Sequence, residues 1–392
     1  MTILKKKKPM DSKAKESIDD FEERRAVKGL RVRDWLYYLG AGLGAVSSTA
    51  FLLGQVLPFS GAIPFVLISY ALFLVYFAIL VSLDDNGQAV ADRMVSVTVN
   101  SLALLVFGTL VFIVVFTVGR GSTALANWNF ISQDMSLAGP LDPLTDGGIT
   151  HAIVGSLTQI AIALVVTVPL GLTTAVYLNE IQSKSSRFVR TIVEAMTALP
   201  SIVAGLFIYA TAILVLGIQK SGLAAALAIS VMMLPIMIRA SDVVLRLVPS
   251  TLKEASLGLG ASNFKTTMMV TLPTARSGLT TAIILATARG VGETSPVLLT
   301  SGFTAALNLD PLQGPMISLP LAIFEFVKSP EPTMIARGFG TAAVLMLLVL
   351  VLFALARLLG SNARPFHQLR IRLNKLVRIM QTFTATLKKE AK

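Results

Sequence analysis

The feature that most constrains this chain is a series of long apolar runs. A helix needs about 20 mostly apolar residues to cross the hydrocarbon core of a bilayer, and the sequence contains eight candidates. A run of this length predicts a helix, because a helix satisfies its own backbone hydrogen bonds in lipid. We therefore expect an all-α polytopic membrane protein with spans at roughly 36–57, 63–83, 95–118, 150–178, 189–217, 223–245, 278–300 and 334–359.

The composition supports the same fold class. Hydrophobic residues make up 54% of the chain and charged residues only 14%, whereas soluble domains carry about 25% charged residues. The sequence has no cysteine, which excludes disulfides and thiolate–metal sites. Its two histidines, His151 and His367, lie far apart and outside any ligand motif, so we expect no metal site.

The net charge of +12 is concentrated near the two ends of the chain. Basic segments beside apolar spans are typical of the cytoplasmic side of a membrane protein. No nucleic-acid recognition motif accompanies the charge, so we expect contact with the bilayer and no nucleic acid. Alternate loops agree with this orientation, because 119–149 and 301–333 contain only Arg120 and Lys328 as cations. Eight spans predict that both termini are cytoplasmic.

The spacing of the spans predicts four parts. The first two spans are joined by the short "PFSGA" stretch, which indicates a helical hairpin added to a six-span body. The fifth span begins with an amphipathic stretch, "RFVRTIVEAMTALP", which we expect at the interface before Pro200. The expected parts are a basic cytoplasmic segment (1–35), an extra transmembrane hairpin (36–94), a permease-like body (95–360) with a cytoplasmic loop (246–277), and a basic cytoplasmic tail (361–392).

Arg289 and Glu293 stand near the middle of the predicted seventh span. A charged side chain at that depth costs about 2.5–3.5 kcal/mol on insertion scales and normally faces a bundle interior or a water-filled path. At positions i and i+4 the two can pair. One interpretation is an ion pair that only locks helix packing. The other is a polar patch on a solute pathway.

Arg239 is a second cation within a predicted span. Its guanidinium group offers donors suited to an oxyanion. Arg239 and Arg289 with Glu293 leave a net positive charge, which favours an anionic solute. Asp242, one turn beyond Arg239, is an alternative local partner that would neutralise it.

The loop at 251–273 predicts a helix–turn–helix on the cytoplasmic face. A first helix carries Glu254 and Ala255, Gly260 permits the turn, and a second amphipathic run ends at Leu272–Pro273. A surface loop that helps to pack the bundle is the alternative. The chain has no GxxxxGK[ST] stretch and therefore no phosphate-binding loop of the ATPase kind.

The stretch "EASLGLGASNFKTTMMVTLP" resembles the EAA loop of ABC-importer permeases, with Ser256 in place of the second alanine. In that family the loop docks on the ATPase subunit. The stretches "LPSIVAGLFIY", "LPIMIRASDVVLRLVPSTLKEAS" and "ARGVGETSPVLLTS" are similar to the PstA-type permeases of bacterial phosphate importers, over about residues 95–360. The matching positions imply that Arg239, Arg289 and Glu293 serve transport.

The resemblance implies a MetI-like six-helix body and a function as half of the translocation pathway of a phosphate importer in the bacterial inner membrane. It also implies three partners: a second, PstC-type permease; a PstB-type ATPase dimer that binds ATP and magnesium; and an extracytoplasmic phosphate-binding protein. The chain itself would bind no cofactor and would not be an enzyme. The alternatives are a permease for molybdate or sulfate, a non-transporting scaffold or sensor, and an autonomous channel or secondary transporter.

Overall fold

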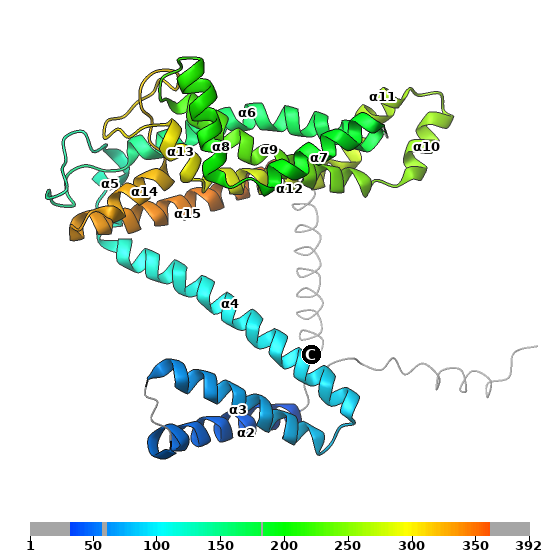
Figure 1. The fold of residues 1–392 in the computed structure, drawn as a ribbon, viewed down its shortest axis with the longest axis vertical. Coiled ribbons are helices and arrows are strands. Elements are labelled where there is room, and N and C mark those ends of the chain that lie inside the picture. Colours follow the sequence, from blue (N-terminus) through cyan, green and yellow to red (C-terminus); the bar gives the residue numbers. More distant parts are fainter. Residues whose placement is uncertain (1–31, 57–60, 182, 361–392) are drawn as a thin grey trace, which may run out of the picture. The chain divides into compact units, whose positions relative to one another are not determined.

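The computed structural model describes residues 32–56, 61–181 and 183–360. All regular secondary structure in these residues is helical, which confirms the predicted fold class (Figure 1). Nearly all of the predicted basic segment 1–35 and the whole predicted tail 361–392 lie outside the described residues. The chain divides into two compact units, Met1–Val111 and Phe112–Lys392, which we describe separately.

The first unit contains a hairpin of two helices. Helix α2 (Val32–Phe51) continues as a short π-helical segment (Leu52–Val56), and α3 (Ala62–Ser82) packs against it. Phe77 and Val81 of α3 are buried against Ala41 of α2. Arg93 forms ion pairs with Asp34 at 2.7 Å and with Asp85 at 2.9 Å. The hairpin therefore combines apolar packing with a charged cluster.

Helix α4 (Gly87–Leu125) is longer than the predicted third span. Its 39 residues correspond to about 58 Å at the usual rise of 1.5 Å per residue. This exceeds the roughly 40–45 Å thickness of a whole bilayer. The division between the two units falls within this helix.

The second unit is built on four long helices that pack against one another (Figure 1). The central helix, α9, has alanines at four positions that are completely buried. Small side chains let neighbouring helices approach closely, which suits helix association in lipid. The four helices are α6 (Thr150–Glu180), α9 (Gly222–Arg246), α12 (Leu272–Val291) and α15 (Pro332–Gly360).

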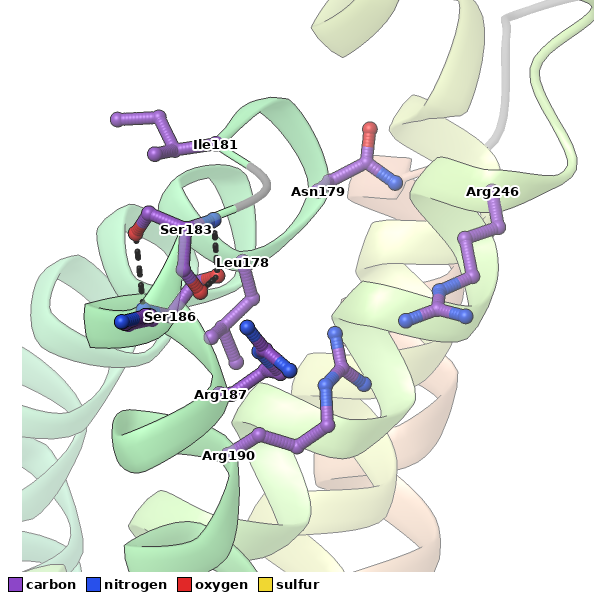
Figure 2. Close-up of a pocket in the computed structure, with 9 residues that line it drawn as sticks. Leu178, Asn179, Ile181, Ser183, Ser186, Arg187, Arg190 and Arg246 are labelled. Atoms are coloured by element: carbon purple, nitrogen blue, oxygen red, sulfur yellow. Dashed lines mark hydrogen bonds between the residues drawn. The ribbon is translucent and has the colours of Figure 1, made fainter.

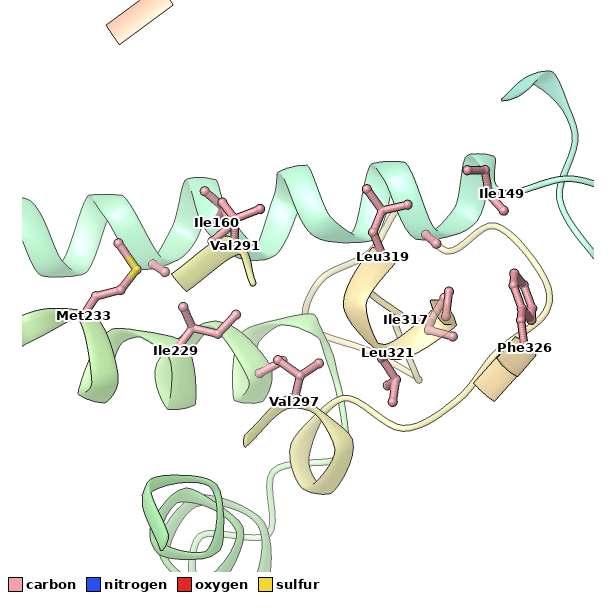
Figure 3. Packing of buried hydrophobic residues seen from close by; sticks show 14 of the residues in the cluster. Ile149, Ile160, Ile229, Met233, Val291, Val297, Ile317, Leu319, Leu321 and Phe326 are labelled. Carbon is pink, nitrogen blue, oxygen red and sulfur yellow. The ribbon is translucent and has the colours of Figure 1, made fainter. Parts of the chain in front are cut away.

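Their main core also takes side chains from two shorter helices (Figure 3). These are α13 (Ser295–Thr300) and α14 (Leu319–Lys328). The core places Ile160 of α6 and Met233 of α9 in one cluster with Val297 of α13 and Leu321 of α14. Segments far apart in the sequence thus form one packed body.

Seven helices of the described residues are long and apolar enough to cross a membrane. The predicted fifth span is a bent pair instead: α7 (Lys184–Ala198) is followed after Pro200 by α8 (Ser201–Ile208) and a π-helical segment (Tyr209–Val215), with a bend of 107°. The bend falls at Pro200, where the amphipathic stretch was expected to end. The 15 residues after the bend span about 22 Å as a helix, so the candidate 189–217 consists of two helices that meet at the expected position.

The predicted seventh span is also displaced. Its helix runs from Asn263 to Val291, and a break follows before α13. Pro273 stands in the first turn of α12, where its missing N–H is tolerated and its φ suits the helix. The expected helix end at Leu272–Pro273 was therefore wrong, and the loop leads directly into the span.

The end of the body where α6 begins is closed by ordered connections, which we call the cap (residues 126–149 and 301–331). Arg337 of α15 is 1% exposed and points into it. Its guanidinium donates to the carbonyl oxygens of Gly139, Asp142, Pro143 and Asp146, at 2.7 Å for the last. One buried arginine thus fixes a loop that has no regular structure of its own.

Asp134 joins the two halves of the cap. Its carboxylate accepts hydrogen bonds from the hydroxyl and N–H of Ser136 and from the N–H of Leu307. The Ser136 hydroxyl, followed by the Leu307 N–H, lowers the pKa of this carboxyl below its usual value. Met135 also donates to the carbonyl of Ala305, so the cap is held by backbone and side chain together.

Candidate functional site

The centre of the candidate site is the break between α12 and α13. Helix α12 ends at Val291, and Gly292 follows as its C-cap. The N–H of Glu293 donates to the carbonyl of Gly290 at 3.2 Å, and α13 begins at Ser295. Arg289 and Glu293 therefore stand at the end of a helix and in the break after it, not in the middle of one helix as predicted. Irregular backbone at membrane depth is tolerated where protein covers it or a cavity adjoins it.

Arg289 and Glu293 form the predicted ion pair, with Nη2 and Oε1 2.9 Å apart. The Glu293 side chain is only 6% exposed, whereas the Arg289 side chain is 54% exposed. Glu293 Oε1 lies within ion-pair distance but lacks an aligned hydrogen bond. The buried carboxylate thus pairs with an arginine whose side chain is more than half exposed.

Two of the stretches that carry the resemblance meet at this break. Helix α8 carries "SIVAGLFI" and packs against α13, which carries "SPVLLT". A Cβ added at Gly205 would lie 2.6 Å from Cα of Pro296, closer than real side chains approach. The glycine is therefore needed for the contact that positions the segment after Glu293.

Arg239 is exposed on α9 and lies at a different level along that helix from Arg289. Gly290 packs against Met233 and Ile229 of α9. Arg239 is at least six residues further along that helix, or about 9 Å at 1.5 Å per residue. Instead, Arg239 lines a small pocket of about 250 Å³ together with Arg190, Asp242 and Arg246.

Asp242 does not neutralise Arg239, which was the alternative drawn from the sequence. Its carboxylate lies 2.9 Å from Nη1 of Arg190 and 3.0 Å from Nη2 of Arg246. Arg190 belongs to α7, far from α9 in sequence. The partner on α9 itself is Arg246, four residues after Asp242, and tertiary packing adds Arg190 from α7.

The loop after α9 forms the predicted helix–turn–helix. Its first helix, α10 (Ser250–Gly258), has no buried residue. Gly260 follows with φ of +85°, a left-handed conformation that glycine adopts without strain. The second helix begins as α11 (Asn263–Thr266) and continues into α12. Ser256, the departure from the EAA pattern, bonds Thr266 across the turn at 2.9 Å.

This loop presents a large apolar and charged surface. Glu254 and Ala255 are exposed. Leu259 is 90% exposed and Phe264 is 69% exposed. Lys253 connects the loop to the end of α6 through the Asn179 side chain at 3.0 Å and the Glu180 carboxylate at 2.8 Å. The loop is thus attached to the bundle on one side and uncovered on the other.

Sequence reasoning missed one buried arginine and one group of cations. Arg337 lies in the predicted eighth span, where one charged residue among apolar ones was the only indication of its role. The group of cations lines a pocket between the end of α6, the start of α7 and the end of α9 (Figure 2). Its cations come from two helices: three follow one another at every third residue of α7, but nothing in the sequence indicates that the end of α9 meets them. The cations are Arg187, Arg190 and Arg246, with Lys184 on the same pocket lining.

Within the described part of the chain, no three His, Cys, Asp or Glu side chains gather closely enough to hold a metal ion. His151 is buried near the start of α6, and neither of its ring nitrogens has a hydrogen-bond partner there. His367 lies outside the described residues.

Comparison with known proteins defines the class. Residues 167–365 match the family described as "Binding-protein-dependent transport system inner membrane component". The chain belongs to this family and is a multi-pass membrane permease.

Its relatives are more specific. The chain is 41% identical to "Phosphate transport system permease protein PstA 1" of Mycobacterium tuberculosis (strain CDC 1551 / Oshkosh), covering 61% of this chain and 79% of the relative. It is 37% identical to the PstA protein of Mycobacterium leprae (strain TN), over 68% of this chain and 91% of the relative. Against the PstA protein of Yersinia pestis it is 35% identical, over 67% and 88%.

Proposed function

We propose that this chain is a permease subunit of an ATP-driven importer of inorganic phosphate and forms half of its translocation pathway. The observation that supports phosphate as the substrate is the 41% identity to a phosphate permease, over 79% of that relative. The charge of the site is consistent with it. Arg289 is paired with buried Glu293 and is more than half exposed, and a guanidinium group suits a tetrahedral oxyanion.

The pathway would run along the surface of this chain rather than through it. Arg289 is more than half exposed on the isolated chain, and a second permease facing that surface would enclose it. An ionised side chain at this depth is tolerated where it lines a water-filled path. Arg239 would act at a different level of the same pathway, because the structure separates it from Arg289 along α9. Glu293 would hold Arg289 while no solute is present.

The remaining partners follow from the loop and the family. The exposed surface around Glu254 and Ala255 would dock on an ATPase dimer, which would bind ATP and magnesium. A PstC-type permease and an extracytoplasmic phosphate-binding protein would complete the complex. The basic loops support placement in the bacterial inner membrane with both termini in the cytoplasm.

Uptake of radiolabelled phosphate tests the substrate. The complete transporter is expressed in cells that lack other phosphate importers, and unlabelled sulfate or molybdate is added as competitor. We expect uptake that neither competitor reduces. If the transporter takes up sulfate or molybdate but not phosphate, that anion is its substrate. If it takes up none of the three, a non-transporting scaffold is favoured.

The ATPase docking surface is tested by co-purification. Ala255→Arg adds a long charged side chain to an exposed position of α10, so the chain should still fold. We expect the ATPase to be lost at unchanged membrane levels of this chain. Thr251→Arg, at an exposed position in the first turn of the same helix, is the matched control and should retain the ATPase. Retention by both variants would contradict docking through this face.

A further inference from the structure

The pocket in Figure 2 is lined by several cationic side chains, and not all of them help to hold the fold together. It has a volume of about 860 Å³ and lies where α6 ends and α7 begins, beside the end of α9. Its described lining includes four cationic side chains and no carboxylate. The lining residues are Leu178, Asn179, Ile181, Ser183, Lys184, Ser186, Arg187, Arg190 and Arg246.

Two of the arginines are held in place from behind. The carboxylate of Asp242, which is 7% exposed, accepts from Nη1 of Arg190 at 2.9 Å and from Nε of Arg246 at 3.2 Å. Nη2 of Arg190 and Nη1 of Arg246 make no hydrogen bond with described residues. Each guanidinium group is therefore fixed by one edge and retains donors on another.

The other two cations of the pocket are Lys184 and Arg187. The side chains of Lys184 and Arg187 form no ion pair or hydrogen bond with the described part of the chain. The guanidinium groups of Arg190 and Arg246 are brought close together by the Asp242 oxygen that they share, and Arg187 lines the same pocket (Figure 2). Like charges so close repel one another, and an anion between them would relieve that repulsion.

The first turn of α7 adds to the positive electrostatic potential in the pocket. Ser183 and Ser186 form a reciprocal cap, in which each side chain accepts from the backbone N–H of the other. The positive end of the α7 dipole therefore lies at the same pocket. Its contribution is secondary to the four side chains.

We propose that this pocket is a binding site for a phosphate group, contacted by Lys184, Arg187, Arg190 and Arg246. Arginine forks are suited to bidentate contact with phosphate oxygens, and a lysine adds a mobile point charge. The volume falls within the range of small-molecule sites and accepts either hydrated inorganic phosphate or the phosphate of an anionic lipid headgroup. This site is separate from the Arg289–Glu293 pair and does not depend on the proposed function.

The wall of the pocket also touches the exposed loop. Asn179 lines the pocket, and its side chain accepts from Nζ of Lys253 in α10 at 3.0 Å. Asn179 would therefore connect a phosphate group bound in the pocket with Lys253 of the loop proposed to dock the ATPase. We therefore expect that binding of a phosphate group in the pocket affects the position of α10.

The test measures binding to the purified full chain in lipid nanodiscs. The double variant Lys184→Gln/Arg187→Gln removes the two cations that support no other contact, so folding should be unaffected. Arg276→Gln/Arg357→Gln changes two exposed arginines outside the pocket and removes the same charge. One arm measures radiolabelled inorganic phosphate by equilibrium dialysis in zwitterionic nanodiscs. The other counts phosphatidylglycerol retained by the chain, by native mass spectrometry.

We expect one of the two ligands to bind the wild-type chain and the control variant, with an affinity at least about tenfold weaker in the pocket variant. Loss in the dialysis arm alone identifies free phosphate, and loss in the lipid arm alone identifies a headgroup. Equal binding by all three chains in both arms, or no binding by the wild type, would overturn the proposal. No transport is measured, so a negative result leaves the importer assignment standing, and a failed uptake assay leaves this result intact.

Discussion

Arg337 and Arg289 are both arginines in apolar helices, yet the structure uses them in opposite ways. Arg337 is buried and gives its donors to four backbone carbonyls of the cap. Arg289 is 54% exposed and has one close partner, Glu293. The comparison teaches that an intramembrane charge is not functional by position alone. The number of its donors that the chain already uses distinguishes a structural arginine from one available to a solute.

The same contrast holds between the two ends of α6, about 46 Å apart for a helix of 31 residues. At its start, the polar groups of the cap bond mostly to one another. At its end, Lys184 and Arg187 face a pocket without partners among the described residues. Changes at the first end should therefore alter stability, and changes at the second should alter binding.

The largest expected effect is that of Arg337→Leu. It removes a charged donor from four partly buried carbonyls of the cap, which we expect to destabilise the body by about 3 kcal/mol. Thermal unfolding of the detergent-solubilised chain measures the loss. Arg357→Leu, at an exposed position of the same helix, should change stability by less than about 0.5 kcal/mol. Equal stability of both variants would show that Arg337 does not hold the cap.

Asp242→Asn should have an intermediate effect. It removes the carboxylate that Arg190 and Arg246 share. Both arginines are partly exposed, so screening limits the expected loss of stability to about 1–2 kcal/mol. The variant should also bind phosphate more tightly in the pocket, because the net positive charge increases. Weaker phosphate binding at retained stability would mean that Asp242 mainly orients the two arginines.

The smallest effect concerns pH at Asp134. Because its folded pKa is lowered, the carboxylate stabilises the cap above the ordinary pKa of 3.8, and this contribution is lost as the pH falls through the folded value. Hydrogen exchange at the Leu307 amide should therefore be equally protected at pH 7 and pH 5. Asp134→Asn should exchange faster at both values. A loss of protection between pH 7 and pH 5 in the wild-type chain would contradict this assignment.

Much of the fold was predictable because a chain that crosses lipid must satisfy its own backbone hydrogen bonds, which a helix does. Apolar runs of sufficient length predicted the helices, and Arg289 and Glu293 were close enough in sequence to predict their pair. The break after Val291 was not predictable, because it depends on how α13 packs against α8 at Gly205 and Pro296. The contact of Asp242 with Arg190 of α7 was missed for the same reason. Contacts between elements distant in sequence leave no periodic signal.

The central claim is that Arg289 serves the solute pathway, and one uptake measurement tests it most directly. The complete transporter carries the wild-type chain, Arg289→Gln, or the control Arg276→Gln, an exposed arginine of the same helix. Membrane levels and the co-purifying ATPase are recorded for each. We predict that Arg289→Gln lowers the rate of phosphate uptake at least about tenfold with assembly intact, while the control transports normally. Uptake by Arg289→Gln at the wild-type rate would show that the pair only locks helix packing.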